Sequence, residues 1–172
     1  KPSSAASDVY KRQSEGYLWD TVLEILKEKA AAGVDVRLIY DDFGCVTTLP
    51  YQYYKSLQQM GIKCAAFNQF RPVLNVILNN RDHRKIAVID GHTAFTGGIN
   101  LADEYINRKE RFGHWKDSGI CLHGEAVWSF TVMFLQMWNI TEHRTDDYAR
   151  YLYRPVSTMA SASVSVKKVS RV

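Results

Sequence analysis

The sequence is poor in the residues that define special classes of protein. It holds 4 prolines, 10 glycines and 3 cysteines among 172 residues, which excludes collagen-like, low-complexity and wholly disordered chains. The cysteines, Cys45, Cys64 and Cys121, lie far apart and form no Cys-x-x-Cys pair. We therefore expect reduced thiols rather than a zinc or redox centre, with one disulfide and a spare thiol as the alternative.

Long hydrophobic runs are also missing. The longest nearly apolar run, Ala126–Trp138, has 13 residues, fewer than the roughly 20 that a membrane-spanning helix needs. The first residues do not have the pattern of a signal peptide. With 46% hydrophobic and 23% charged residues, the composition favours a soluble segment of one domain that can bury a substantial core.

The excess of positive charge lies outside the central part of the sequence. The formal net charge is +4, yet residues 14–147 carry 14 basic and 17 acidic side chains. Residues 148–172 hold five basic side chains and no acidic one. A domain that binds nucleic acid by neutralising phosphates would show basic charge on its body, so we expect no nucleic-acid partner.

The two ends differ from the middle in composition. Residues 1–13 lack apolar periodicity and resemble a translated cloning or adapter sequence, so we expect an artefact or a disordered leader there. Residues 14–150 form the predicted catalytic domain. Residues 151–172, which end in a simple stretch of serine, valine and lysine, are expected to be a tail or linker.

The middle alternates between helical and strand patterns, which predicts an α/β layered fold with a mixed β-sheet flanked by helices. Apolar residues at helical spacing predict helices over Tyr17–Ala32, Tyr51–Met60 and Glu125–Ile140. Alternating or short apolar segments predict strands over Val34–Tyr40, Ile62–Phe67, Lys85–Asp90, Thr93–Thr96 and Asp117–Leu122. A tight turn at Gly91-His92 would join two of these strands as a hairpin.

One segment carries the clearest chemistry. His83 and Lys85 are two residues apart at the start of a strand, so their side chains share a face. Asp90, five residues after Lys85, is expected on the opposite face, which suits a structural role. The pattern is completed by two glycines that permit close backbone approach and by an amide in the following turn: Gly97, Gly98 and Asn100.

These residue types suit chemistry at a phosphodiester. A neutral imidazole can attack phosphorus and form a covalent phosphohistidine, which splits one difficult displacement into two easier ones. An ammonium group and an amide N–H can hold the non-bridging oxygens and stabilise the charge that spreads over them. This chemistry requires no metal and no cofactor.

The spacing HxKxxxxDxxxxxxGGxN resembles the signature of the phospholipase D superfamily. Four further runs are similar to bacterial cardiolipin synthases: GVDVRLIYDDFG from Gly33, LNNRDHRK from Leu78, NLADEYIN from Asn100 and HWKDSGICLHG from His114. The resemblance covers about residues 14–139. It implies a phospholipase D-like fold and a phosphatidyltransferase that joins two phosphatidylglycerol molecules through a phosphohistidine, releasing glycerol.

The resemblance also implies roles for single residues. His83 would be a catalytic histidine, and Lys85 and Asn100 would bind the phosphate, with Gly97 and Gly98 beside them. Asp90 would support the structure of the motif. Asp117 is similar to the acidic residue that orients the catalytic histidine in relatives, where such an acid fixes the tautomer and stabilises the cationic form.

The sequence departs from cardiolipin synthases in having one motif and no hydrophobic anchor segment. In that family the histidine of a second, equivalent half acts as the general acid. We therefore expect a truncated half that is nearly inactive alone. Its partner would be a second phospholipase D-like half, in cis in the full-length protein or as a second copy in a homodimer. The full-length protein is expected in the bacterial cell membrane, with the catalytic domain cytoplasmic and at the membrane surface.

Two alternatives to the cardiolipin synthase remain. One is a homodimeric one-motif phosphodiesterase or nuclease of the same superfamily. The other is a non-catalytic module that keeps the fold. The presence of His83, Lys85 and Asn100 together argues against the second alternative.

Other polar residues have simpler explanations. The spacing of His92, His114 and His123 fits no common zinc pattern. We expect His92 to be exposed in the hairpin turn and His114 to lie on a loop or at the rim of the site. Asp41 and Asp42 favour a structural turn after a strand.

Charged and aromatic side chains around the motif leave some alternatives open. Asp103 and Glu104 are expected to stabilise the N-terminus of a helix after Asn100. Arg81 and Arg84 could attract anionic headgroups or be solvated charges. An aromatic and aliphatic stripe favours a core helix, with a membrane contact or a face for the missing half as alternatives: Trp128, Phe134, Leu135 and Trp138.

Overall fold

The computed structural model describes residues 16–45, 49–69, 82–111, 113–154 and 167–169. The helices are α1 (Tyr17–Ala31), α2 (Asp42–Cys45), α3 (Tyr53–Gln59), η2 (Asp103–Ile106), α4 (Val127–Glu142) and η3 (Tyr148–Tyr151). The strands are β1 (Arg37–Asp41), β2 (Lys63–Phe67), β3 (Lys85–Ile89), β4 (Thr93–Gly97), β5 (Gly119–His123) and β6 (Lys167–Val169). Every helix and strand predicted by residue range is present with shifted ends, whereas α2, η3 and β6 were not predicted.

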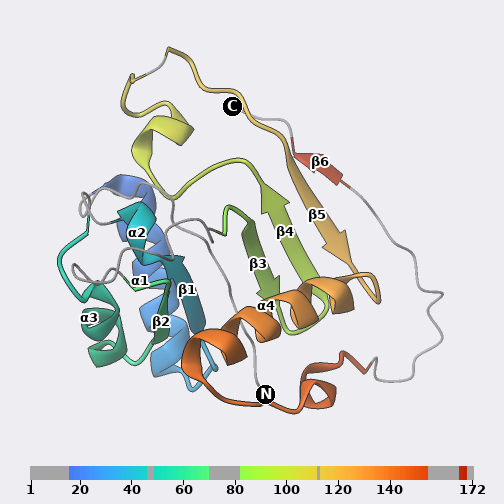
Figure 1. The fold of residues 1–172 in the computed structure, drawn as a ribbon. Helices are drawn as coiled ribbons and strands as arrows, with labels where there is room; N and C mark the ends of the chain where they lie inside the picture. Colours follow the sequence, from blue (N-terminus) through green and yellow to red (C-terminus); the bar gives the residue numbers. More distant parts are fainter. Residues whose placement is uncertain (1–15, 46–48, 70–81, 112, 155–166, 170–172) are drawn as a thin grey trace.

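The strands form two hydrogen-bonded sheets (Figure 1). β1 and β2 pair in parallel, and the other four strands pair antiparallel in the order β3-β4-β5-β6. The predicted α/β layered fold is therefore confirmed, with its parallel and antiparallel strands in separate sheets. β6 belongs to the predicted tail and pairs with β5.

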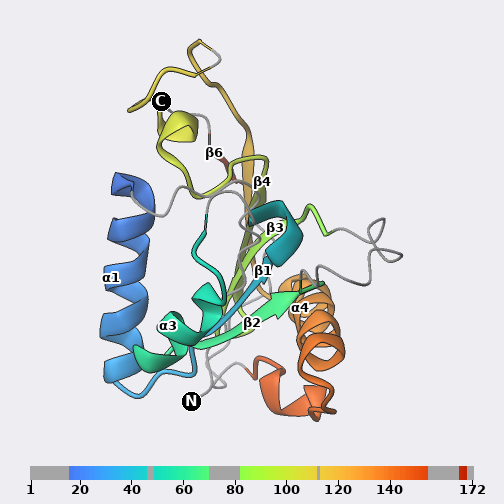
Figure 2. The ribbon, with the colours of Figure 1, turned by 60° about the vertical axis from the view of Figure 1, so that its left-hand side comes forward.

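Helix α4 packs against both sheets and joins them. Its C-terminal half contributes three side chains to a cluster with Ile39 of β1 and Ala65 of β2: Phe134, Leu135 and Trp138. Its first turn places Val127 against β3 and β4. Figure 2 shows α4 on one side of the strands and α1 and α3 on the other. The predicted core helix is confirmed, and Trp128 in its first turn is half-buried.

Strand β1 is buried at all five positions, which explains the run of three apolar residues, Leu38 to Tyr40, between its charged ends. Opposite α4, Leu38 and Tyr40 pack into a core with Trp19 of α1 and Leu57 of α3. Each of these four side chains is at most 2% exposed. Complete burial of a large apolar side chain is worth about 2 kcal/mol, so this layer is a main source of stability.

Arg37, one of the two charged residues of β1, is buried and has several polar and aromatic partners. Its guanidinium donates to Asp146 at 2.6 Å and to Asp35 at 3.0 Å, and also to the hydroxyl of Tyr151. It lies over the rings of Trp138 and Tyr151. Burial alone would lower the pKa of Arg37, but Asp146 and Asp35 outweigh it and raise the pKa. The cluster ties β1 to the segment that contains η3.

Helix α1 begins without a side-chain cap of its own and takes one from a distant residue. The carboxylate of Asp103, in η2, accepts from the backbone N–H groups of Tyr17 at 3.0 Å and Leu18 at 2.9 Å. Asp103 was predicted to stabilise the start of the helix after Asn100. It does begin η2, but the backbone groups it caps belong to α1.

Among the described residues, no helix combines the length and the apolar character needed to cross a membrane. The three cysteines are buried and form no disulfide. This agrees with the expectation of reduced thiols.

Candidate active site

The predicted site residues gather where β3 starts, β4 ends and β5 starts. In the register of the sheet, Lys85 lies opposite Gly97, and Gly97 lies opposite Gly119. Residues paired in this way place their side chains on the same face, so Lys85 stands beside a strip of bare backbone. Ile86 faces α4, and the alternation of the strand therefore directs Lys85 to the opposite face of the sheet.

His83 lies just before β3 and is exposed. The ammonium group of Lys85 donates to the backbone carbonyl of His83 at 2.7 Å, which holds the predicted catalytic histidine and the predicted phosphate-binding lysine close together. The loop that precedes them is organised by Asp82, which accepts from the backbone N–H of Arg84 at 3.0 Å and from its guanidinium at 2.8 Å. Arg84 therefore has a structural partner beside the site.

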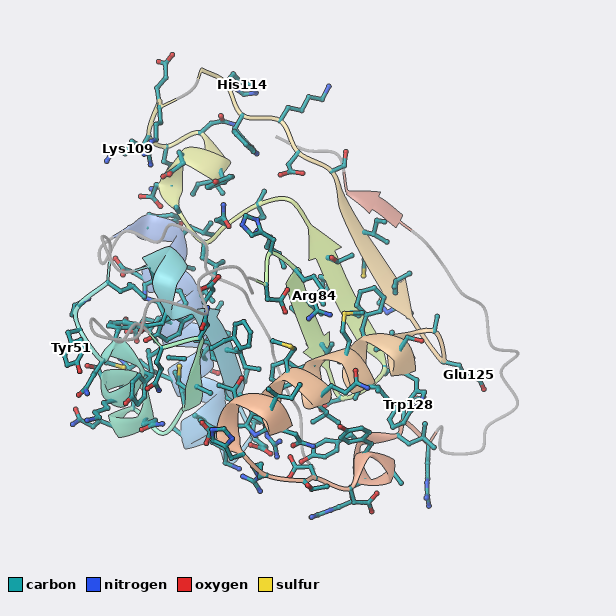
Figure 3. All side chains as sticks on the ribbon, viewed as in Figure 1. Tyr51, Arg84, Lys109, His114, Glu125 and Trp128 are labelled. Carbon is teal, nitrogen blue, oxygen red and sulfur yellow. The ribbon has the colours of Figure 1, made fainter. Side chains whose placement is uncertain are left out.

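The electrostatics of this loop follow from the same contacts. Burial acts to raise the pKa of Asp82, but the hydrogen bonds from Arg84 and the nearby charge of Lys85 outweigh it and lower the pKa. Asp82 therefore remains a carboxylate at neutral pH. Figure 3 shows Arg84 beside β3, and Lys109 and His114 on the loop that extends beyond the ends of β4 and β5.

Asp117 lies against Gly98. A Cβ atom on Gly98 would be 2.6 and 2.8 Å from the two carboxylate oxygens of Asp117, so only glycine permits this approach. Asp117 accepts from the indole N–H of Trp115 at 3.2 Å and from the backbone N–H of Ser118 at 2.7 Å. His83 is not among these partners, and the histidine-orienting role of Asp117 remains a prediction.

Asn100 is buried, with 6% of its surface exposed. Its Nδ2 donates to the hydroxyl of Tyr105, and its Oδ1 has no hydrogen-bond partner among the described residues. The ring of Tyr105 meets the ring of Trp115 edge to face at 4.7 Å. Contacts between side chains therefore connect Asn100 with Asp117.

Asp90 lies apart from the other site residues. It follows β3 in the hairpin turn, where Asp90 has φ 52° and Gly91 has φ 64°, and His92 N–H donates to the carbonyl of Ile89 at 3.0 Å. The turn is therefore made by Asp90-Gly91, one residue earlier than predicted, and Asp-Gly is a favoured pair for such turns. At about 3.3 Å per residue, Asp90 is about 16 Å along the chain from Lys85.

The remaining histidines lie elsewhere. At the Asp90 end of the sheet, Thr93 hydrogen-bonds to both His92 and His123. His92 also packs on Tyr153 and is half-buried, so the expectation that it is exposed was wrong. In the part of the chain that the structure describes, no group of three or more His, Cys, Asp or Glu side chains is arranged to hold a metal ion.

Residues 16–138, which contain this site, match the family model described as "Cardiolipin synthase, PLD-like domain". The chain belongs to this family. A cardiolipin synthase from Listeria innocua is 37% identical over 136 residues, which are 78% of this chain and 28% of that protein. One from Oceanobacillus iheyensis is 36% identical over 148 residues, 86% of this chain and 30% of that protein.

An uncharacterized protein from Streptococcus mutans is more similar, at 50% identity over 139 residues, which cover 81% of this chain and 30% of that protein. The chain thus spans less than a third of the length of these relatives. The solved structure of Nuc, a phospholipase D family member from Salmonella typhimurium, has a TM-score of 0.52 at 15% identity and covers 81% of this chain and 78% of its own. It confirms the predicted phospholipase D-like fold.

Sequence reasoning missed the residues that hold the predicted ones in place. Tyr105 and Trp115 contact Asn100 and Asp117, and the side chain of Asn107 hydrogen-bonds to the backbone N–H and carbonyl of Trp115 at 2.6 and 2.9 Å. All three lie within or beside runs that resemble cardiolipin synthases. No spacing rule separates them from other polar and aromatic residues there.

Proposed function

We propose that this domain is the catalytic half of a cardiolipin synthase in which His83 is the nucleophile. Nε2 or Nδ1 of His83 attacks the phosphorus of one phosphatidylglycerol. A P–N bond forms, the bond from phosphorus to the headgroup oxygen breaks, and glycerol leaves after taking a proton from a general acid. The headgroup hydroxyl of a second phosphatidylglycerol then attacks phosphorus, loses its proton, breaks the P–N bond and gives cardiolipin.

The observation that carries this proposal is the glycine strip beside Lys85, within a family of cardiolipin synthase domains. Gly97 and Gly119 leave the backbone open on the face of Lys85, so a tetrahedral phosphate can approach the ammonium group. His83 adjoins that group through its own carbonyl. Asn100 supplies an amide at the end of β4, and such donors stabilise the charge of a phosphoryl transition state.

The general acid comes from outside the chain in this proposal. A second phospholipase D-like half, in the same full-length protein or in a second copy of the chain, places its histidine opposite His83. General acid catalysis of this kind is worth about 10²–10⁴-fold. The domain acts at the surface of the bacterial cell membrane, on its cytoplasmic side, where phosphatidylglycerol is the substrate.

The test measures products from phosphatidylglycerol in mixed micelles over a range of chain concentrations. We expect cardiolipin and glycerol in equal amounts, at a rate per chain that rises with concentration as two copies pair. His83→Ala and Lys85→Ala should lose the activity. His143→Ala, which changes a histidine at the far end of α4, is the matched control and should keep it.

Two results would contradict the proposal. Phosphatidic acid and glycerol without cardiolipin would indicate a hydrolase. Cleavage of DNA or of a simple phosphodiester, with phosphatidylglycerol left intact, would favour the homodimeric phosphodiesterase or nuclease.

A further inference from the structure

Two aromatic side chains connect Asn100 with Asp117 in the candidate site. We call Tyr105 and Trp115 the aromatic bridge. The hydroxyl of Tyr105 accepts from Nδ2 of Asn100, its ring meets that of Trp115 at 4.7 Å with an angle of 70° between the planes, and the indole N–H of Trp115 donates to Asp117. Asn100 and Asp117 are 17 positions apart in the sequence, and the bridge makes them one connected unit.

The amide of Asn100 is incompletely satisfied in this arrangement. Nδ2 donates to Tyr105, while Oδ1 is buried and finds no hydrogen-bond partner among the described residues. Nδ2 carries two hydrogens. Tyr105 takes one of them, which leaves the second for an anionic oxygen. The hydrogen bond to Tyr105 therefore fixes the direction in which the amide of Asn100 points.

The other end of the bridge is held firmly. The side chain of Asn107 accepts from the backbone N–H of Trp115 at 2.6 Å and donates to its carbonyl at 2.9 Å. With its backbone fixed on both sides, Trp115 packs its ring against that of Tyr105 and donates its N–H to Asp117. Packing and hydrogen bonding of this kind hold a catalytic constellation in its productive geometry.

We propose that Tyr105 and Trp115 are positioning residues, which orient Asn100 and Asp117 for a phosphate group. This proposal rests on the proposed function for the assignment of Asn100 as a phosphate ligand. Neither ring takes part in the chemical step. Tyr105 acts through the amide of Asn100, and Trp115 acts through Tyr105 and the carboxylate of Asp117.

The chain offers a matched control for Tyr105. Asn139 also donates through Nδ2 to a tyrosine hydroxyl, that of Tyr148, at 3.4 Å, and its Oδ1 is also buried with no partner in the part of the chain that the structure describes. This pair lies at the far end of α4, away from Lys85. Tyr148→Phe therefore removes the same type of hydroxyl from the same type of amide outside the site.

The experiment measures the affinity of the chain for inorganic phosphate from the shifts of side-chain amide resonances. We expect Tyr105→Phe to weaken phosphate binding about tenfold, the effect of one hydrogen bond, with the thermal unfolding midpoint close to that of the wild type. Tyr148→Phe should bind phosphate like the wild type. Trp115→Phe, which keeps a ring against Tyr105 but removes the N–H, should weaken binding less than Tyr105→Phe.

A double variant separates positioning from a general effect on the fold. If Tyr105 acts through Asn100, Tyr105→Phe with Asn100→Ala binds phosphate no more weakly than Asn100→Ala alone. Unchanged phosphate affinity in Tyr105→Phe, effects that simply add, or no phosphate binding by the wild type would each overturn the positioning role.

Failure of the proposed function gives a different result, because phosphate binding needs no turnover. A chain that shows this pattern of phosphate affinities but makes hydrolysis products instead of cardiolipin would refute the synthase and keep the positioning role. A chain that makes cardiolipin while Tyr105→Phe keeps the wild-type kcat and phosphate affinity would keep the synthase and refute the positioning role.

Discussion

At the scale of single residues, the absence of a side chain at Gly97 and Gly98 determines how closely the segment with Asp117 can approach the end of β4. A Cβ on Gly97 would lie 3.2 Å from the carbonyl of Ser118, and one on Gly98 would lie within 3 Å of both carboxylate oxygens of Asp117. The backbone carbonyl cannot move without bending β5. Both glycines of the motif therefore allow close approach of the segment that carries Asp117.

Gly98→Ala should displace the carboxylate of Asp117 and reduce cardiolipin formation about 100-fold, since a misplacement of about 1 Å in a catalytic site can cost that much. The measurement is the initial rate with phosphatidylglycerol micelles. Gly124→Ala is the control, because Gly124 follows the far end of β5 and, its chain neighbours apart, no atom of the described residues lies within 4 Å of its added Cβ. We expect this control to lose only about twofold. Equal rates for the two variants would show that Asp117 does not need its present position.

The sequence singles out the residues for which a chemical role is proposed, and it does not reveal the residues that act through a contact. His83, Lys85 and Asn100 stand out because a histidine, an amine and an amide have few structural reasons to recur in this spacing. Tyr105 and Trp115 do not, because an aromatic residue in a sequence is as consistent with a core position as with a bridge. Asp90 was expected at the end of a strand, yet an Asp-Gly pair is at least as strong a signal for a turn.

At the scale of elements, the structure depends on contacts between segments that are distant in sequence. The cap of α1 by Asp103 links the first helix to the segment that follows Asn100. A capping carboxylate is apparent from sequence when it directly precedes its helix. Asp103 instead caps Tyr17 and Leu18, which lie 86 and 85 positions before it in the chain. The division of the strands into two sheets was missed for the same reason, because strand pairing is set by tertiary contacts.

Asp103→Ala should lower the free energy of unfolding by about 1–2 kcal/mol, because it leaves two backbone N–H groups of α1 without their acceptor. The measurement is the midpoint of urea unfolding. Asp20→Ala removes another acidic residue from the first turn of α1 and should change the stability by about 0.5 kcal/mol or less. A loss for Asp20→Ala as large as that for Asp103→Ala would show that charge near the helix end, rather than the cap, is responsible.

At the scale of the whole molecule, buried charges connect the first strand to the last described helical segment. Asp35 pairs with Arg37 at 3.0 Å and with Lys63 at 2.8 Å. Burial acts to raise the pKa of Asp35, but hydrogen bonds from Lys63 and Arg37 outweigh it, and the pKa lies below its ordinary value of 3.8. The ionised carboxylate of Asp35 therefore stabilises the folded state at pH values above 3.8. This stabilisation is lost as the pH falls through the lowered pKa of Asp35.

The thermal stability of the wild type should accordingly fall as the pH is lowered. In Asp35→Asn the thermal stability should fall less steeply over the same pH range. The measurement is the thermal unfolding midpoint between pH 6 and pH 3, where an amide at position 35 no longer titrates. Asp20→Asn, on the exposed side of α1, is the control and should follow the wild type. An Asp35→Asn variant that loses stability as steeply as the wild type would contradict this account.

The layered fold was predictable because its signals are local and repeated. Residues 34–40 alternate, glycine follows the predicted helices over residues 17–32 and 51–60, and the stripe of α4 has helical spacing. The burial of Arg37 was not predictable, since its partner Asp146 is 109 positions away. The pattern of the sequence therefore predicts the layers and the candidate site residues, whereas the connections that hold the two sheets and the site together become visible only in three dimensions.

In the proposed mechanism, His83 forms a covalent bond to phosphorus. The most direct test is to mix the chain with phosphatidylglycerol, quench in base to preserve the P–N bond, and locate the adduct by peptide mass spectrometry. The account predicts one phosphatidyl group on His83, absent from His83→Ala and retained in His123→Ala. An adduct on another residue, or cardiolipin formation without any adduct on His83, would contradict it.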